Sequence, residues 1–282
     1  MFAKFCATHG LSYLPASNYT LLLFITHLSS KNLSLSTIKV YISSIITLHN
    51  INGLVPPNPK NPQIRLALRA ISHASPEPEQ KSPITFKLLH TIWNVASKLP
   101  EFRCIQAALA LGFFGGMRGA EYLLTRFNPG PKLQQVQFVG KDCSAMNYTV
   151  LKSKTKPKGF VIPLSCSGHQ VCAVCTMKAY LQFRHEPLEL LGNKPLFLYQ
   201  GSELSKAKMN AIIKDLVGSI GLPPSKFSLH SLRAGVATTA ATSNFKPWEL
   251  KLLGGWATNT FNAYIRPPAQ HRRNFARRLA RK

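Results

Sequence analysis

The sequence predicts a mainly α-helical fold with a small antiparallel three-stranded sheet (α+β), arranged in two domains. Apolar residues recur at helical spacing over most of the chain. The period changes to two between about residues 136 and 164, where three short runs are typical of strands. The segment 75–83 is polar and Pro-rich without either period, which is typical of a linker. We therefore expect domains over 1–74 and 84–282.

The first domain is predicted to be entirely helical. Residues 1–9 look like a helix entered midway, so we expect this domain to be N-terminally shortened. Ser17 and Ser36 each precede apolar residues at helical spacing, and serine is a favoured residue at the start of a helix. The Pro-rich loop 56–62 ends the second of these patterns, and 63–72 is expected to form another short helix.

The second domain is expected to begin with helices and to return to them after the sheet. Thr85 precedes one helical pattern, and a second apolar helix starts at about Phe102. Beyond the strands, 171–184 has the pattern of one continuous helix. Ser205 is expected to cap a further helix, and another begins at His230.

The three predicted strands are 136–138, 148–151 and 160–163. The turn between the last two carries four lysines within seven residues, which is typical of a loop that contacts phosphates. These are Lys152, Lys154, Lys156 and Lys158.

The charge of the chain points to a polyanionic partner. Thirty-five Lys and Arg face ten Asp and Glu, which gives a formal net charge of +25. Nucleic acid is favoured over an anionic membrane surface. A two-metal nuclease needs clustered carboxylates, whereas the only aspartates here are Asp142 and Asp215 and the glutamates are scattered. Any phosphoryl transfer is therefore expected to proceed without a metal or another cofactor.

The cysteines and the apolar runs bear on location. Six cysteines without a regular framework are typical of a reducing compartment. The apolar run 21–25 is far too short to span a membrane, and the N-terminus lacks a signal-peptide pattern. We expect an intracellular protein with no membrane partner, which would be nuclear in a eukaryotic host.

One cysteine-rich segment has the spacing of a zinc knuckle: Cys166-x2-His169-x2-Cys172-x2-Cys175. Only two residues separate its halves, and the last two cysteines are expected to share one turn of a continuous helix. We therefore favour small buried thiols over a zinc site, and predict no metal.

The candidate catalytic groups begin with Arg118, which follows a glycine pair between two predicted helices. At such a junction a guanidinium can reach a cleft, and Glu121, one turn further on, can orient it. Taken alone, Arg118 fits an arginine on a solvated helix end equally well.

The stretch from Leu229 to Pro267 adds the other groups that phosphodiester chemistry needs. His230 and Arg233 lie three residues apart on one helical face. Trp256 follows a Gly-Gly turn, and Tyr264 lies on the next short helix. A nucleophile, cations for the non-bridging oxygens and proton carriers are thus present in order.

These residues resemble the tyrosine recombinase (phage integrase) superfamily, which includes the Xer and Cre recombinases, and most of all its transposon-encoded DIRS-like and Crypton-like members. The family pattern is an Arg with an acid three residues on, a hairpin Lys, His-x-x-Arg, a His or Trp, and a Tyr. Here it is matched at Gly116–Glu121, Ser153–Thr155, His230–Arg233, Gly254–Trp256 and Tyr264. Pro83-Ile84-Thr85 also resembles the usual opening of the catalytic domain.

The resemblance implies a site-specific DNA recombinase that cuts by transesterification without ATP. Tyr264 would attack the scissile phosphate to give a 3′-phosphotyrosyl link. Arg118 and Arg233 would hold the phosphate, His230 would accept the phenol proton, Lys154 would protonate the leaving 5′-oxygen, and Trp256 would donate a hydrogen bond.

It also implies partners and a domain role. Residues 1–74 would be the core-binding (SAM-like) DNA-binding domain and 84–282 the catalytic domain. Double-stranded DNA would be the substrate of a homo-tetramer on two duplexes. The expected DNA contacts are Lys39, Arg65, Arg69, Lys152, Lys156 and Lys158, and the basic tail 271–282 is expected either to touch DNA, to dock on a neighbouring subunit or to be a solvated end.

Several alternatives stay open at this point. Trp256 precedes Tyr264 by eight residues, one fewer than the family's usual spacing, which falls on Gly255. Lys152 or Lys156 could replace Lys154 in its role. A catalytically silent DNA-binding protein derived from a mobile element would share the fold, and a type IB topoisomerase would share the chemistry. If Tyr264 is not the nucleophile, the candidates are Tyr122, Tyr148 and Tyr199.

Overall fold

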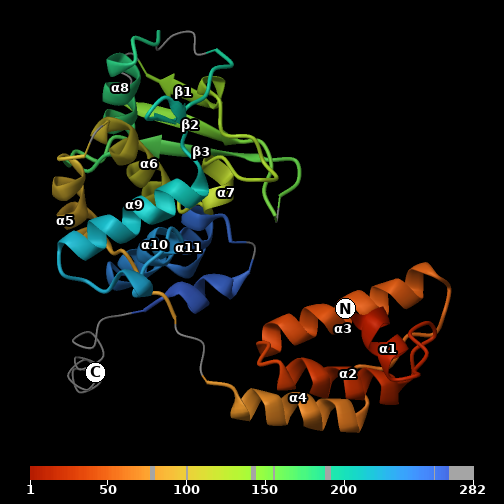
Figure 1. Ribbon diagram of the computed structural model, residues 1–282. Helices are drawn as coiled ribbons and strands as arrows, with labels where there is room; N and C mark the ends of the chain where they lie inside the picture. The colour runs from red at the N-terminus through yellow and green to blue at the C-terminus, as the bar shows by residue number, and fades with distance from the viewer. Residues whose placement is uncertain are drawn as a thin grey trace, which may run out of the picture. The chain divides into compact units, whose positions relative to one another are not determined.

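The computed structural model divides into two compact units, Met1–Glu79 and Gln80–Lys282 (Figure 1). Each unit has a hydrophobic core of its own. The boundary between them lies within the Pro-rich segment 75–83. The residues described are 1–76, 80–99, 101–140, 144–154, 156–187, 192–256 and 258–266, so the basic tail 271–282 lies outside them.

The first unit contains four helices: α1 (Phe2–Thr8), α2 (Asn18–Ser30), α3 (Leu35–Ile51) and α4 (Pro62–Ala74). The prediction of Ser17 as a cap is confirmed, because its side chain accepts a hydrogen bond from the backbone N–H of Thr20. The prediction of Ser36 is wrong by two residues. Ser34 has extended backbone angles and accepts from the N–H of Thr37, so Ser36 already lies inside the first turn.

The three-stranded sheet of the second unit is confirmed, with strand order β1-β2-β3 and antiparallel pairing throughout. The strands are β1 (Val136–Val139), β2 (Ala145–Val150) and β3 (Phe160–Ser165). Strand β2 starts three residues earlier than expected because Ala145–Asn147 pair with both neighbours. A second pair, β4 (Leu198–Tyr199) and β5 (Ser202–Glu203), was not predicted, since two-residue strands show no alternation.

Helices account for most of the rest of this unit. The α-helices are α5 (Phe86–Ala96), α6 (Phe102–Phe114), α7 (Gly119–Tyr122), α8 (Ala173–Phe183), α9 (Lys206–Ser219), α10 (His230–Thr242) and α11 (Pro247–Gly254), and the 3-10 helices are η1 (Leu133–Gln135), η2 (Pro224–Lys226) and η3 (Asn259–Tyr264). Helix α6 is apolar on all sides and buried along most of its length, because it packs against both α8 and α10. It forms the centre of the unit.

The predicted helix starts of this unit are mostly confirmed. Ser205 accepts from the N–H of Lys208, and α6 starts at Phe102 as expected. Thr85 occupies the N-cap position of α5, although its side chain makes no capping hydrogen bond. The expected helix 171–184 is shorter than predicted: α8 begins at Ala173, after a loop that ends at its N-cap, Cys172.

Helix α10 is held closely against the segment that opens this unit. The N–H of Ile84 donates to the carbonyl of Ser231 over 2.8 Å. A Cβ at Gly235 would lie 1.7 Å from the carbonyl oxygen of Ile84, so only glycine allows this approach. The contact fixes the helix that carries His230 and Arg233.

No helix within the described parts of the chain is both long enough and apolar enough to cross a membrane.

Candidate active site

Arg118 lies at the start of α7, between two helices as predicted. Its Nη1 donates to Glu121 Oε1 over 3.0 Å, and its backbone N–H donates to Glu121 Oε2 over 2.7 Å. The Glu121 side chain is 3% exposed and the Arg118 side chain 30% exposed. The buried carboxylate therefore holds the guanidinium at a surface, which is the pairing that the sequence indicates.

Arg233 lies on α10 and is almost fully buried, at 1% exposure. Its Nη1 donates to the carbonyl of Gly116. Gly116 has φ +55°, a left-handed conformation that favours glycine, and a Cβ there would lie 2.7 Å from the carbonyl oxygen of Leu253. The glycine pair before Arg118 thus turns a carbonyl toward the second arginine.

Trp256 covers the Arg233 guanidinium from one side. The Arg233 Cζ lies 4.2 Å from the centroid of the Trp256 ring, a cation–π contact. Gly255 ends α11 in the left-handed conformation, with φ +58°, and a Cβ at Gly254 would lie 1.9 Å from the indole ring. Both glycines are therefore needed to place the indole here.

Tyr264 completes the group from η3. Its ring centroid lies 5.7 Å from Arg233 Cζ, 5.7 Å from the Trp256 ring and 5.1 Å from the His230 ring. The side chain is half-buried, while His230 is exposed at the first position of α10. We call Arg118, His230, Arg233, Trp256 and Tyr264 the arginine–tyrosine cluster.

Three donors of this cluster are buried without an acceptor. Within the described residues, Arg233 Nε, Arg233 Nη2 and Trp256 Nε1 have no hydrogen-bond partner. A buried unsatisfied donor costs roughly 1–3 kcal/mol, and more when it is charged. The fold therefore keeps together donors that an anion would satisfy.

The cations also act on His230. Its pKa is lowered by partial desolvation of the side chain, and then by the positive charges of Arg233, Arg266, Arg118 and Lys206. The imidazole is therefore neutral at neutral pH and able to accept a proton. Burial likewise lowers the pKa of Arg233, as does the nearby Arg118, while Glu121 and Tyr264 act in the opposite direction.

The structure does not bring every predicted residue to this cluster. Lys154 is exposed on the turn between β2 and β3, and among the described residues no hydrogen bond or ion pair links it to the cluster. Lys156 Nζ lies 4.5 Å from the Phe160 ring centroid instead. The predicted DNA contacts Lys39, Arg65, Arg69, Lys152, Lys156 and Lys158 are all exposed.

The alternative nucleophiles are poorly placed. Tyr122 and Tyr148 are buried, at 1% and 0% exposure, and burial raises the pKa of each phenol. The Tyr148 hydroxyl donates to the carbonyl of Glu121. Tyr199 is 8% exposed, and burial again raises its pKa. Of these tyrosines, Tyr264 lies beside Arg233.

Three supporting residues were not predicted from the sequence. Arg266 and Lys206 contribute charge at His230. Thr238 Oγ1 donates to the carbonyl of Tyr264 over 3.2 Å and accepts from the N–H of Arg266 over 3.0 Å. In the sequence, Thr238 is visible only as a threonine in an Ala-rich helical segment. That pattern does not predict which backbone groups its hydroxyl contacts.

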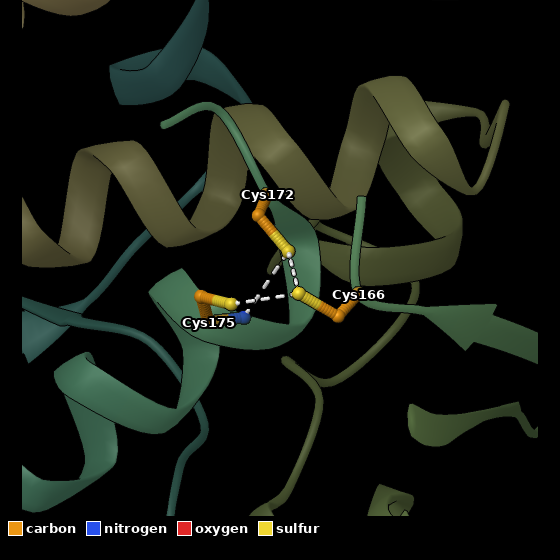
Figure 2. A group of neighbouring side chains, drawn as sticks. All are labelled: Cys166, Cys172 and Cys175. Carbon is orange, nitrogen blue, oxygen red and sulfur yellow. Dashed lines mark hydrogen bonds between the residues drawn. The ribbon is translucent and has the colours of Figure 1, made fainter. Parts of the chain in front are cut away.

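The expectation for the cysteine segment is wrong in one respect. Cys166 and Cys175 are exposed, and only Cys172 is buried. The three sulfurs lie within 4.8 Å of one another (Figure 2). Because α8 starts only after Cys172, the loop before it is free to bring Cys166 back to the first turn. We call these residues the thiol cluster.

Comparison with known proteins agrees with the predicted fold. No family model matches the chain. The chain is 27% identical over 257 residues to the integrase/recombinase xerD homolog of Selenomonas ruminantium, covering 85% of this chain and 70% of that protein. The sequence is thus similar to that of an Xer-type integrase/recombinase, which supports the predicted resemblance to the tyrosine recombinase superfamily.

Solved structures of tyrosine recombinases share its fold. The Tn1549 transposon integrase in complex with transposon right end DNA matches with a TM-score of 0.62 at 14% identity, over 94% of this chain and 86% of that one. The XerH site-specific recombinase bound to palindromic difH substrate matches with a TM-score of 0.61 at 17% identity, over 92% and 69%. The recombinase fold thus extends over both units, while the DIRS-like or Crypton-like subtype stays a prediction.

Proposed function

We propose that this protein is a tyrosine recombinase that cuts and rejoins double-stranded DNA at specific sites through a covalent 3′-phosphotyrosyl link to Tyr264. The observation that carries the proposal is the set of buried donors in the arginine–tyrosine cluster, two on Arg233 and one on Trp256, that lack acceptors among the described residues. These donors lie beside Tyr264. Among the four candidate tyrosines, it is the one that is neither fully buried nor distant from Arg233.

A phosphodiester supplies what these donors lack. Its two non-bridging oxygens carry the negative charge and accept several hydrogen bonds each. Arg118, held by Glu121, and Arg233, held by Gly116, present guanidinium groups that remain charged and match phosphate geometry. The same groups would stabilise the extra negative charge that develops on the non-bridging oxygens during attack.

Groups of this chain and of the DNA account for every bond and proton in the chemical step. The Tyr264 oxygen forms a bond to phosphorus as its proton passes to neutral His230, whose ring is adjacent. The bond from phosphorus to the 5′-oxygen breaks, and that oxygen takes a proton from Lys154. The phosphotyrosyl ester keeps the energy of the broken bond, so rejoining to a 5′-hydroxyl needs neither ATP nor a metal.

The substrate and the assembly follow from charge and from the related proteins. A formal net charge of +25 favours a long polyanion, and the Tn1549 integrase and XerH structures are DNA complexes. Exchange between two duplexes needs a nucleophile for each of four strands, so we propose a homo-tetramer on two DNA duplexes.

The test is covalent capture on DNA selected by the protein from a random pool. A nicked suicide substrate that loses its 5′-hydroxyl fragment should trap the wild-type protein on a denaturing gel. Tyr264→Phe should bind the same DNA and trap none, because the nucleophilic oxygen is absent. Tyr199→Phe is the matched control and should trap DNA normally.

Three results would contradict the proposal. Binding without capture by the wild type would identify a catalytically silent DNA-binding protein, and capture by Tyr264→Phe would disprove the nucleophile. Relaxation of supercoils by a monomer, without exchange between duplexes, would instead favour a type IB topoisomerase.

A further inference from the structure

The thiol cluster lies at the junction of β3 and α8. Cys166 directly follows β3, Cys172 is the N-cap of α8, and Cys175 lies in its first turn. The Cys166 Sγ lies 3.2 Å from Cys175 Sγ and 3.7 Å from Cys172 Sγ. Figure 2 shows the three side chains pointing toward a common centre from the loop and the helix.

These separations match three ligands of one ion. Zinc binds thiolate sulfur at about 2.3 Å, so two ligands of a tetrahedral ion lie about 3.8 Å apart. A disulfide would require a sulfur–sulfur distance of about 2.05 Å, and all three cysteines are free thiols in the structure. The observed sulfur–sulfur distances are therefore closer to those of two ligands of one zinc ion than to that of a disulfide.

The loop before α8 holds the sulfurs in place. The N–H of Cys166 donates to the carbonyl of Ser144 over 2.7 Å, which ties the end of β3 to the start of β2. Gly168 has φ +67°, and the Ser167 hydroxyl donates to the carbonyl of Val171 over 3.1 Å. The loop therefore turns back sharply between Cys166 and Cys172.

Backbone donors favour a thiolate at Cys172. The N–H groups of Ser167 and Cys175 each lie 3.4 Å from Cys172 Sγ. These N–H groups point their positive ends at the sulfur and would stabilise negative charge on it. Three thiolates this close repel one another unless a cation lies between them.

We propose that Cys166, Cys172 and Cys175 bind one structural zinc ion. Thiolates select this soft divalent ion over calcium or magnesium, which prefer oxygen ligands. Three thiolates complete all but one position of a tetrahedral site, and the remaining position takes water or another donor.

His169 is not one of the ligands, despite its place in the sequence motif. Its Nδ1 accepts a hydrogen bond from the N–H of Val171 over 3.1 Å, which leaves the proton of the neutral ring on Nε2. The ring packs against Phe86 and His90, with centroid distances of 5.1 Å and 5.4 Å. Of the residues in the knuckle pattern, only the cysteines are therefore proposed to bind the ion.

The ion would join the sheet to the helical core. It links the end of β3 to α8, and α8 packs on α6, which leads through Gly115 and Gly116 to Arg118. The β2–β3 turn that carries Lys154 lies at the opposite end of β3. Zinc would therefore stabilise the unit that carries the arginine–tyrosine cluster without touching its reacting groups.

The test measures metal binding and does not require any reaction with DNA. The full chain, produced with zinc and kept reduced by a phosphine, should contain about one zinc per chain, with at least three Zn–S bonds of about 2.3 Å by X-ray absorption. Cobalt substitution should give a thiolate-to-cobalt charge-transfer band. Chelation should lower the thermal unfolding midpoint.

Variants identify the ligands. Cys166→Ser and Cys175→Ser should each lose the zinc and the cobalt band while keeping the wild-type circular dichroism, since both side chains are exposed. Cys104→Ala is the matched control and should retain both, because Cys104 is buried in the core of the same unit and burial raises its pKa to about 12.

Two results would overturn the proposal: a folded, reduced wild-type protein that binds neither zinc nor cobalt, or metal loss in Cys104→Ala equal to that in the Cys166 and Cys175 variants. None of these measurements depends on DNA cleavage, so the failure of the proposed recombinase activity would leave this result unaffected.

Discussion

The arginine–tyrosine cluster and the thiol cluster lie in the same unit and have opposite requirements. The first gathers hydrogen-bond donors and positive charge, and its key donors on Arg233 and Trp256 are buried. The second gathers sulfur acceptors that become negative on deprotonation, and two of its three members are exposed. The first suits an anion and the second a cation.

The difference shows where each ligand acts. Burial weakens competition from water and strengthens electrostatic interactions, so the donors at Arg233 gain most when charge develops on a bound phosphate. At an exposed site with soft ligands, a bound ion stabilises the fold mainly by cross-linking two secondary-structure elements. We therefore expect substitutions in the first cluster to affect rate, and those in the second to affect stability.

Arg233→Lys should have the largest effect on rate after loss of the nucleophile. Lysine keeps the charge but lacks the planar guanidinium, which can contact the Gly116 carbonyl, the Trp256 ring and a phosphate at the same time. Cleavage in a single turnover should fall about a hundredfold or more. Arg103→Lys is the control, since Arg103 lies over the rings of Phe102 and Phe183. An unchanged rate would show that Arg233 only fills the core.

Glu121→Gln should have a smaller effect, because it acts through Arg118. The amide keeps one acceptor but loses the charge that holds the guanidinium. We expect the single-turnover rate to fall about tenfold, less than on removal of a donor itself. In an Arg118→Ala background the same substitution should add little. Full additivity would mean that Glu121 supports only the fold around α7.

The pH dependence should show the smallest effect. Because desolvation, and then the cationic neighbours, lower the pKa of His230, the neutral form persists as pH falls through the ordinary histidine range near 6.5. Cleavage should therefore decline only at lower pH. Lys206→Gln removes one of the cations, so the His230 pKa should rise and the acidic decline should move to higher pH.

Lys208→Gln is the control for that profile. Lys208 is two residues away and lies over the Tyr199 ring, 5.4 Å from its centroid, rather than at His230. Its profile should match the wild type. A Lys206→Gln profile that is unchanged, or that moves to lower pH, would contradict the electrostatic account.

Periodic features were predicted well from the sequence. Apolar spacing identified α6 and α9, and alternation identified β1, β2 and β3, because each element is long enough to show its period. Local ambiguity remained where two residues compete for one role. Both Ser34 and Ser36 can cap a helix, and only the backbone conformation selects Ser34.

The arginine–tyrosine cluster was predictable as a set of residues but not as an arrangement. Spacing placed His230 and Arg233 on one face, local motifs singled out Arg118, Trp256 and Tyr264, and the resemblance assigned each of them a role. Neither indicates that Gly116 supplies the carbonyl that Arg233 meets, or that Arg266 and Lys206 influence His230. Those contacts join segments that are far apart in the chain.

The sequence by itself determined which chemical groups are present: an excess of cations, few carboxylates, a tyrosine after a His-x-x-Arg helix, and cysteines at knuckle spacing. Only the tertiary structure decided which of them meet. It left donors of Arg233 and Trp256 buried without acceptors in the described part of the chain, and it turned Cys166 toward α8 while His169 packs on His90. Burial and the direction of a turn depend on contacts between distant segments, and no local pattern of residues encodes them.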